Sequence, residues 1–172
     1  MATPASEEAA TVEAARAGDP GAFAALYSRY ARMVHGMLLA RVPRDEVDDL
    51  VQDVFVSVLR RLRSLRDPGA FGGWLAMIAR NRAADYHRRN RETVELPDLA
   101  AVPTGDREAA EALEAVRSLP EAYRETLILR LVEGMSGAEI ADRTGLTPAS
   151  VRVNLHRGMK MLRERLKGAS HE

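Results

Sequence analysis

The sequence predicts an all-α protein built from two small helical domains. Alanine, leucine, arginine and glutamate dominate, and aromatic residues make up only 5% of the chain, a composition that favours helices over strands. Apolar residues make up 46%, enough for folded cores, and they recur at three- and four-residue steps. That period breaks over residues 92–106, which are acidic and contain two prolines and one glycine. We therefore expect domains at residues 1–91 and 107–172, joined by a flexible acidic linker at residues 92–106.

Three helices are expected in the first domain, separated by turns and a loop rich in glycine and proline. The second of them has acidic residues in its first turns and arginines near its end, as the helix dipole favours. In chain order, we predict a segment at 12–17, a turn at 18–21, a helix at 23–38, a stop at Pro43, a helix at 47–62, a loop at 67–73 that includes Gly72 and Gly73, and a helix that begins at Trp74 and includes Tyr86.

The second domain is predicted to contain four helices. Ser136 and Glu139 fit a capping box, in which each side chain accepts a hydrogen bond from the other residue's backbone amide. Gly145 can adopt the positive φ of a tight turn. In chain order, we predict a helix at 109–119, a helix that starts at Pro120 and ends by Gly134, with Leu127, Ile128, Leu131 and Val132 as its apolar face, a short helix at 136–144, and a final helix from Thr147-Pro148 to about Leu166.

Ala141, Gly145 and Val151 fit a helix-turn-helix. The small residue lets two helices approach, the glycine makes the bend, and the β-branched residue packs the second helix into the core. The exposed face of that helix carries Arg152, Asn154, His156, Arg157 and Lys160, residue types that can bind guanine, adenine or phosphate. Basic residues outnumber acidic ones 6 to 1 over residues 147–167. The combination favours DNA binding over a helical hairpin whose basic face is merely solvated.

The formal net charge is zero, but the two signs are separated along the chain. Residues 68–91 hold five basic and one acidic side chain, whereas residues 92–125 hold three basic and nine acidic ones. A second basic island lies at residues 152–167. A local basic patch attracts phosphate whatever the total charge, so we expect one DNA contact in each domain.

The composition argues against an enzyme, a metalloprotein and a membrane protein. Cysteine is absent, the four histidines have no ligand spacing, and no glycine loop suited to phosphate occurs. No apolar run approaches the roughly 20 residues that span a bilayer, and residues 1–17 are too acidic for a signal peptide. We expect a cytoplasmic protein with no membrane insertion, no catalytic residue, no metal and no cofactor.

Three segments, in order, resemble signatures of the extracytoplasmic-function type of sigma factor. Residues 48–55, Asp-Asp-Leu-Val-Gln-Asp-Val-Phe, resemble its region two. Residues 74–81, Trp-Leu-Ala-Met-Ile-Ala-Arg-Asn, with Asp85 and Arg88, resemble the promoter-melting helix that follows, and residues 119–165 resemble region four. The resemblance covers almost the whole chain. It implies an alternative sigma factor that binds core RNA polymerase and directs promoter recognition and transcription initiation.

The resemblance also implies that one face of residues 48–63 docks on the clamp helices of the polymerase's largest subunit. The helical period assigns the apolar positions to the core, namely Val47, Leu50, Val51, Val54, Val58 and Leu62. The remaining candidates for the polymerase surface are Asp49, Gln52, Asp53, Leu59 and Arg60.

By the same resemblance, the minus-ten element of the promoter meets residues 63–73 and the start of the next helix. Asn81 is the expected contact to a base edge, and the expected phosphate contacts are Arg80, Arg82, Arg88 and Arg89. Trp74 lies on the apolar face of its helix, so a core role is favoured, and a stacking role stays open.

The minus-thirty-five element would be contacted by Arg152, Val153, His156 and Arg157, with Asn154 and Lys160 on the same helix. Relatives often carry a small polar residue where Val153 stands and a basic one where Asn154 stands, so base preference cannot be transferred. The resemblance further implies that the second domain docks on the polymerase flap, that the linker follows the RNA exit path, and that an anti-sigma factor acts as an external inhibitor.

Two other classes of protein stay open at this point. A dimeric helix-turn-helix repressor or activator would bind duplex operator without polymerase, but it gives the first domain and its basic helix no purpose. A helical adaptor would bind nucleic acid only weakly and lose it at modest salt.

Overall fold

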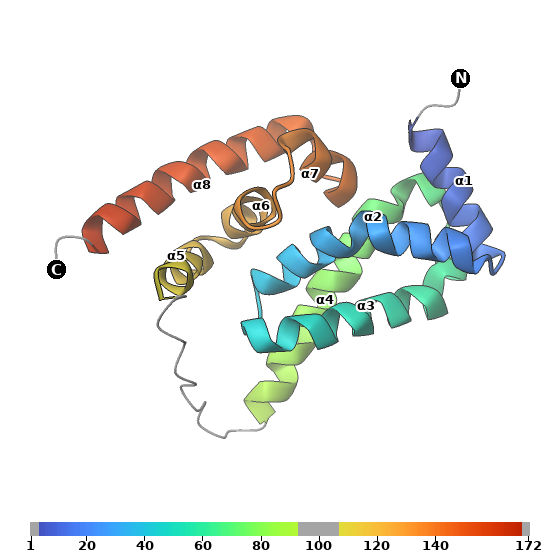
Figure 1. The fold of residues 1–172 in the computed structure, drawn as a ribbon, viewed down its shortest axis with the longest axis horizontal. Coiled ribbons are helices and arrows are strands. Elements are labelled where there is room, and N and C mark those ends of the chain that lie inside the picture. The colour runs from blue at the N-terminus through green and yellow to red at the C-terminus, as the bar shows by residue number, and fades with distance from the viewer. Residues whose placement is uncertain (1–3, 93–106, 170–172) are drawn as a thin grey trace.

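The computed structural model describes residues 4–92 and 107–169, and within these ranges all regular secondary structure is helical (Figure 1). The α-helices are α1 (Pro4–Arg16), α2 (Pro20–Leu39), α3 (Val47–Arg61), α4 (Phe71–Glu92), α5 (Arg107–Arg117), α6 (Glu121–Leu131), α7 (Gly137–Thr144) and α8 (Pro148–Ala169). Short 3₁₀ helices lie at η1 (Arg44–Glu46), η2 (Leu62–Ser64) and η3 (Pro68–Ala70). The predicted all-α class is confirmed.

Helix α2 is the centre of the first domain and packs against α1, α3 and α4 (Figure 1). Tyr30, Met33 and Met37 project from it into the core and are fully buried. Asp19 caps its start by accepting hydrogen bonds from two backbone amides of the first turn. The core positions predicted on and after α3 are confirmed as buried, namely Val47, Leu50, Val51, Val54, Val58 and Leu62.

Helix α1 is longer than the predicted segment at residues 12–17. It begins at Pro4 and packs along α2. Its first turns are rich in alanine and glutamate, so they carry little apolar period. Tertiary contacts stabilise this part of the helix instead. Val12 is fully buried, and the Tyr30 hydroxyl donates a hydrogen bond to the Glu8 carboxylate at 2.7 Å.

The predicted loop at residues 67–73 is wrong at its end, because α4 begins at Phe71 and contains Gly72 and Gly73. A glycine pair usually marks a break in a helix. Here the pair lies where α4 meets the end of α7, and a Cβ atom on Gly72 would lie 2.5 Å from the backbone oxygen of Arg143. Gly72 therefore permits a close approach between two helices rather than a turn.

The second domain contains the predicted helix-turn-helix. The capping box at the start of α7 is present: the Glu139 amide donates to Ser136 Oγ at 3.1 Å, and the Ser136 amide donates to Glu139 Oε2 at 2.8 Å. Gly145 ends α7 at φ 76°, and α8 starts at Pro148 as expected. Val151 is buried, which fixes α8 against the rest of the domain.

Helix α6 differs from the prediction in two details. It starts at Glu121, with Pro120 as the residue before the first turn. Leu131 and Val132 were expected on its apolar face, but both side chains are more than half exposed. Leu131 is the last residue of α6 and Val132 is its C-cap, so the burial that covers Leu127 does not extend to the end of the helix.

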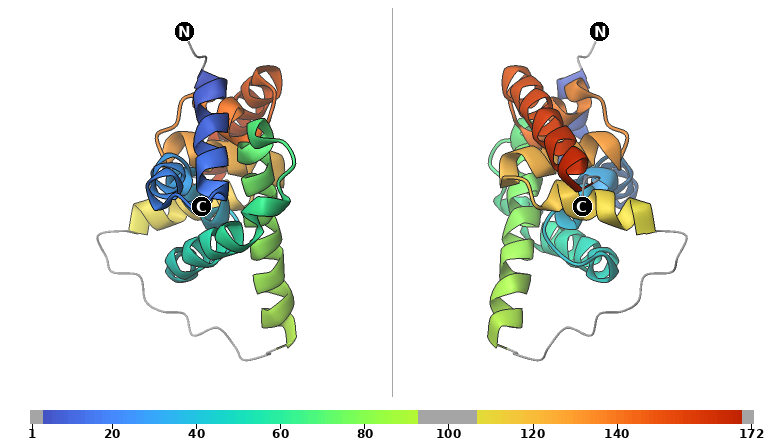
Figure 2. Two further views of the ribbon diagram at one scale, coloured as in Figure 1. Left: turned by 90° about the vertical axis from the view of Figure 1, so that its right-hand side faces the viewer. Right: turned by 90° about the vertical axis from the view of Figure 1, so that its left-hand side faces the viewer.

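The two domains are packed against each other in this structure. Helix α2 contacts α6 and α7, and α4 contacts α7, whereas the last turns of α4 extend away from both domains (Figures 1 and 2). The sequence suggested domains able to separate and gave no sign of this contact. Of the predicted linker at residues 92–106, Glu92 ends α4, and residues 93–106 lie outside the described residues.

Charged side chains on α2 meet the second domain along most of the helix. Arg29 pairs with Asp142 at 2.8 Å, and Arg32 donates to the backbone oxygen of Glu133. At the C-terminal end of α2, the Arg117 guanidinium of α5 donates to the Leu39 and Val42 carbonyls at 3.0 and 2.7 Å. These hydrogen bonds provide partners for carbonyl groups that have none within the helix.

We expect Ser136→Ala to lower the free energy of unfolding of the protein by about 1 kcal/mol, because it removes the acceptor of the capping box. Urea unfolding followed by circular dichroism measures the change. Ser118→Ala is the matched control: its hydroxyl donates only to the Ala115 carbonyl one turn earlier, so the expected change is within about 0.5 kcal/mol. Equal effects of the two substitutions would contradict a capping role.

The contact between His35 and Glu133 predicts a pH-dependent stability. The hydrogen bond that His35 donates to the Glu133 carboxylate raises the pKa of His35 above 6.5, against partial burial, and Asp48 adds to the rise while Arg44 opposes it. A pKa raised by folding means that the charged pair stabilises the protein below pH 6.5 and that this contribution is lost as the pH rises through the raised value.

We therefore expect the difference in free energy of unfolding between the wild type and His35→Gln to be largest below pH 6.5 and to shrink above it. Urea unfolding at a series of pH values measures this difference. Glu133→Gln should flatten the pH profile in the same way. A difference that is constant with pH would exclude the pair as its source.

Candidate nucleic-acid interface

The recognition face of α8 is exposed. Val151, Gly158 and Leu162 are buried at steps of seven and four residues, which turns the intervening side chains outward. Five of the six predicted minus-thirty-five residues are exposed, namely Arg152, Val153, His156, Arg157 and Lys160. The sixth, Asn154, is half-buried and lines a pocket together with Arg41, Arg80 and Glu125.

The geometry of α7 and α8 suits insertion into a major groove. The capping box fixes the start of α7, and Gly145 and Pro148 fix the two ends of the turn between α7 and α8, so the exposed face of α8 is held by a rigid frame. The close fit of α8 on α6 depends on Gly158, whose missing side chain leaves room for Leu127 and Tyr123. The structure thus brings the predicted minus-thirty-five residues together on one helix, with Asn154 at the edge of the exposed face.

Four of the five predicted minus-ten residues are divided between three environments on α4. Arg88 and Arg89 are exposed near the projecting end of the helix, where Arg88 pairs with Asp85. Asn81 is exposed. Arg82 is half-buried and pairs with Asp53 of α3. These side chains lie on one helix but do not form a single patch.

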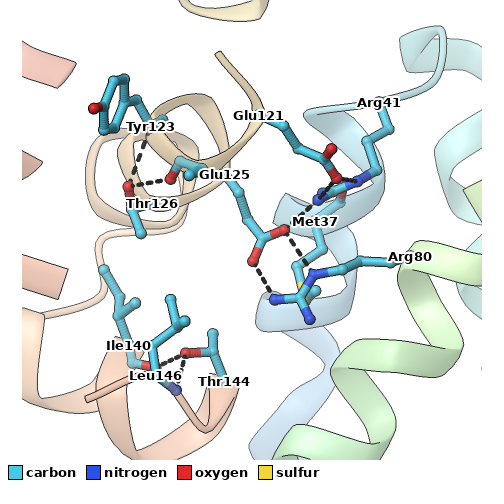
Figure 3. A network of polar contacts seen from close by, with 11 residues as sticks. Met37, Arg41, Arg80, Glu121, Tyr123, Glu125, Thr126, Ile140, Thr144 and Leu146 are labelled. Carbon is cyan, nitrogen blue, oxygen red and sulfur yellow. Dashed lines mark hydrogen bonds and ion pairs between the residues drawn. The ribbon is translucent and has the colours of Figure 1, made fainter. Parts of the chain in front are cut away.

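Arg80 is the fifth predicted minus-ten residue, and its guanidinium is already bound. Its Nη2 and Nε atoms donate to the two carboxylate oxygens of Glu125 at 2.8 and 3.2 Å (Figure 3). Glu125 also accepts a hydrogen bond from Arg41, which pairs with Glu121 at 2.7 Å. The ion pair between Arg80 and Glu125 therefore links α4 to the second domain. The side of the Arg80 guanidinium that faces Glu125 is not accessible to solvent.

The carboxylate of Glu125 is buried and ionised. Its side chain is only 5% exposed. Burial would raise the pKa of Glu125, but the hydrogen bonds from Arg80 and the charge of Arg41 outweigh it, so the pKa lies below its usual value. The hydrogen bonds that Arg80 donates to Glu125 in turn raise the pKa of Arg80, against the effect of burial.

Glu125 and Arg41 were missed by reasoning from the sequence. A signal for Glu125 was present, because it stands one turn before Leu129 on the side of α6 that carries the buried apolar residues. A charged residue at such a position is rarely buried without a partner. The sequence gave no sign of which arginines would supply the partner.

The predicted polymerase surface forms a stripe on α3. Asp49, Gln52, Leu59 and Arg60 are exposed, and Leu59 is 60% exposed although it is apolar. Asp53 is half-buried beside the stripe through its pair with Arg82. Sequence reasoning missed Val56, which is 45% exposed and lies at helical spacing between Gln52 and Leu59.

Trp74 packs against the core but stays partly exposed, with its ring centroid 6.0 Å from that of Phe71. Its packing on Phe71 fits the favoured core role, and its partial exposure leaves the stacking role open. Within residues 4–92 and 107–169, no group of three or more histidine or acidic side chains could hold a metal ion. Over the same residues, no helix has the length and apolarity needed to cross a bilayer.

Comparisons with known proteins identify both domains. The profile of Sigma-70 region 2 matches residues 26–93, and that of Sigma-70, region 4 matches residues 109–162. The RNA polymerase sigma factor CarQ of Myxococcus xanthus is 37% identical over 90% of this chain and 95% of its own length. The ECF RNA polymerase sigma-E factor of Haemophilus influenzae is 30% identical over 91% of this chain and 94% of its own length.

A solved structure has the same fold. CnrH, determined in complex with the cytosolic domain of CnrY, aligns with a TM-score of 0.66 and 26% identity. The alignment covers 94% of this chain and 97% of CnrH. The two region matches, the full-length relatives and this fold agree with one another. The chain belongs to the sigma-70 family and is an extracytoplasmic-function RNA polymerase sigma factor.

Proposed function

We propose that the first domain binds core polymerase and the minus-ten element, and that the second domain binds the minus-thirty-five element. The observation that carries this proposal is the presence of three separate surfaces on one chain: the α3 stripe, the basic end of α4 and the exposed face of α8. A duplex-binding repressor needs only the last of these. A factor that binds core polymerase and both promoter elements uses all three surfaces.

The α3 stripe suits a protein partner. It combines two exposed apolar side chains, Val56 and Leu59, with the polar side chains of Asp49 and Gln52. Apolar residues at the centre of a patch with polar residues around them are typical of a protein interface. The clamp helices of the largest polymerase subunit are the proposed partner.

The two basic surfaces suit nucleic acid in different forms. Helix α8 presents arginines and a histidine on one rigid face, as needed for contacts to base edges in a major groove. The end of α4 extends away from both domains (Figure 2), and its residues 88–91 include Arg88, Arg89 and Arg91. Such a basic projection suits the phosphates of a separated strand.

The protein acts by binding rather than by catalysis, and the polymerase carries out the chemistry. Contacts made only with the melted strand favour the open complex over duplex DNA, which shifts a population without any reacting group on this chain. We assign no catalytic residue and no cofactor to it, and place its action in the cytoplasm, where polymerase meets the chromosome.

An external inhibitor is the remaining proposed partner. CnrH was solved in complex with the cytosolic domain of CnrY, and its fold covers both domains of this chain. We place the second domain on the polymerase flap and propose an anti-sigma factor as the inhibitor, on the strength of that likeness and of family membership.

We expect Val56→Asp and Gln52→Ala each to weaken assembly with core polymerase by at least about tenfold, or about 1.4 kcal/mol, because both lie at the centre of the α3 stripe. Fluorescence anisotropy of labelled protein titrated with core enzyme measures the affinity. Arg61→Ala is the control, since Arg61 is exposed on the same helix away from the stripe. Assembly undiminished by both stripe substitutions would refute this surface.

Replacing Arg152 or Arg157 with alanine should weaken promoter binding by about 1–3 kcal/mol if that side chain contacts a base. The promoter is first selected by in vitro transcription with core polymerase on a library of fragments, and binding of the holoenzyme to it is then measured. Arg165→Ala, two turns further along α8, should change affinity less. No transcript from any fragment would reject the function itself.

A further inference from the structure

We infer that Val153 is a specificity-determining residue of α8, which recognises a thymine in the bound element through the C5-methyl group of that base. The inference rests on the proposed function, because it takes α8 as the helix that enters a major groove. It adds a base type and names the side chain responsible for it. The arginines of α8 do not supply this information, since arginine binds guanine and phosphate.

Val153 lies at the centre of the exposed face of α8. The helix packs on α5, α6 and α7 (Figure 1), and its buried positions include Val151 and Gly158. At about 100° per residue, Val153 points about 200° away from Val151, almost directly opposite the packed side. It is 44% exposed. Ala149, one turn earlier, points the same way but has only a methyl group, so Val153 reaches furthest toward the base pairs from this end of the helix.

An apolar side chain at this position limits which base can be its partner. All four bases carry hydrogen-bonding groups in the major groove, and thymine alone also carries an apolar group there, the C5-methyl. Against guanine or cytosine, valine would displace water from polar groups without replacing the hydrogen bonds, which is unfavourable. Against the thymine methyl group, valine removes two apolar surfaces from water, which is favourable. The contact therefore favours a pair of thymine and adenine, with the thymine on either strand.

The other side chains of α8 offer no second way to recognise such a pair. Adenine is normally recognised by the amide of asparagine or glutamine. Asn154 is the only amide side chain within Pro148–Ala169, and it is half-buried and lines a pocket with Arg41 and Glu125. It points about 100° away from Val153. The exposed neighbours of Val153 are Arg152, His156 and Arg157, so the methyl contact is the one that adds thymine to guanine in the recognised sequence.

Helix geometry also limits the distance between that thymine and a guanine. Arg157 follows Val153 by one turn, or about 6 Å along the axis at 1.5 Å per residue. Stacked base pairs are about 3.4 Å apart. A guanine bound by Arg157 therefore lies within about two base pairs of the thymine bound by Val153.

The test replaces each thymine of the minus-thirty-five element, on both strands of the selected promoter, by deoxyuridine, which lacks only the C5-methyl group. Binding of the labelled duplex to the holoenzyme is measured by fluorescence anisotropy for the wild type, Val153→Ser and Val132→Ser. Val132 is the matched control, because it is a valine of similar exposure, 53%, at the end of α6 rather than on α8. Circular dichroism checks that both variants keep their helical content.

At one thymine, we expect deoxyuridine to weaken wild-type binding by about fourfold, which corresponds to about 0.8 kcal/mol for one buried methyl group. Val153→Ser should bind the thymine and deoxyuridine duplexes equally. Val132→Ser should keep the fourfold difference. Since the replacement is made in the DNA, the wild-type comparison does not depend on the folding of any variant.

Three results would overturn the inference: no thymine whose replacement weakens wild-type binding, a difference that survives in Val153→Ser, or a difference that is lost in Val132→Ser. The second result would assign the methyl contact to another residue, such as Ala149. Failure of the proposed function looks different, because promoter binding would then be unchanged in Arg152→Ala and Arg157→Ala, or no fragment would give a transcript. Normal transcription from an element insensitive to deoxyuridine rejects only the role of Val153.

Discussion

The ionised carboxylate of Glu125, buried between Arg41 and Arg80, is the interaction on which the arrangement of this protein depends. A buried charge is tolerated only when its partners are in place, and here both partners belong to the other domain. Arg41, just after the end of α2, and Arg80 of α4 must therefore both face α6 for the carboxylate to stay in its position. The fixed positions of these three side chains allow only one relative placement of the domains. An apolar contact alone would let the two domain surfaces slide past each other.

Helix α2 packs into the core of the first domain with one side and contacts the second domain with another. Tyr30, Met33 and Met37 fill the core of the first domain, whereas Gly36 and, just beyond the end of the helix, Arg41 contact the second. The polar side of this helix is compatible with water when the domains are apart, because arginines there need no cover. A surface that is stable in both situations is what a protein with separable domains requires.

Local patterns in the sequence predicted most of the fold and the α8 face, because these depend on neighbours in the chain. The capping box, the turn at Gly145 and the buried positions of α3 all follow from local periodicity and local hydrogen bonding. The partner of Arg80 could not be found in this way, since Glu125 lies 45 residues away. Gly72 was misjudged for the same reason: the sequence shows that a side chain is missing but not which distant backbone fills the space.

Gly36 and Gly72, at the contact between the domains, also have a genetic consequence. A glycine codon becomes an alanine codon through a single base change, so each position lies one point mutation from a methyl group that the packed arrangement cannot accept. Such a mutation would leave the exposed side chains of α8 unchanged. The contact between the two domains is therefore open to change by a single mutational step that leaves every charged side chain in place.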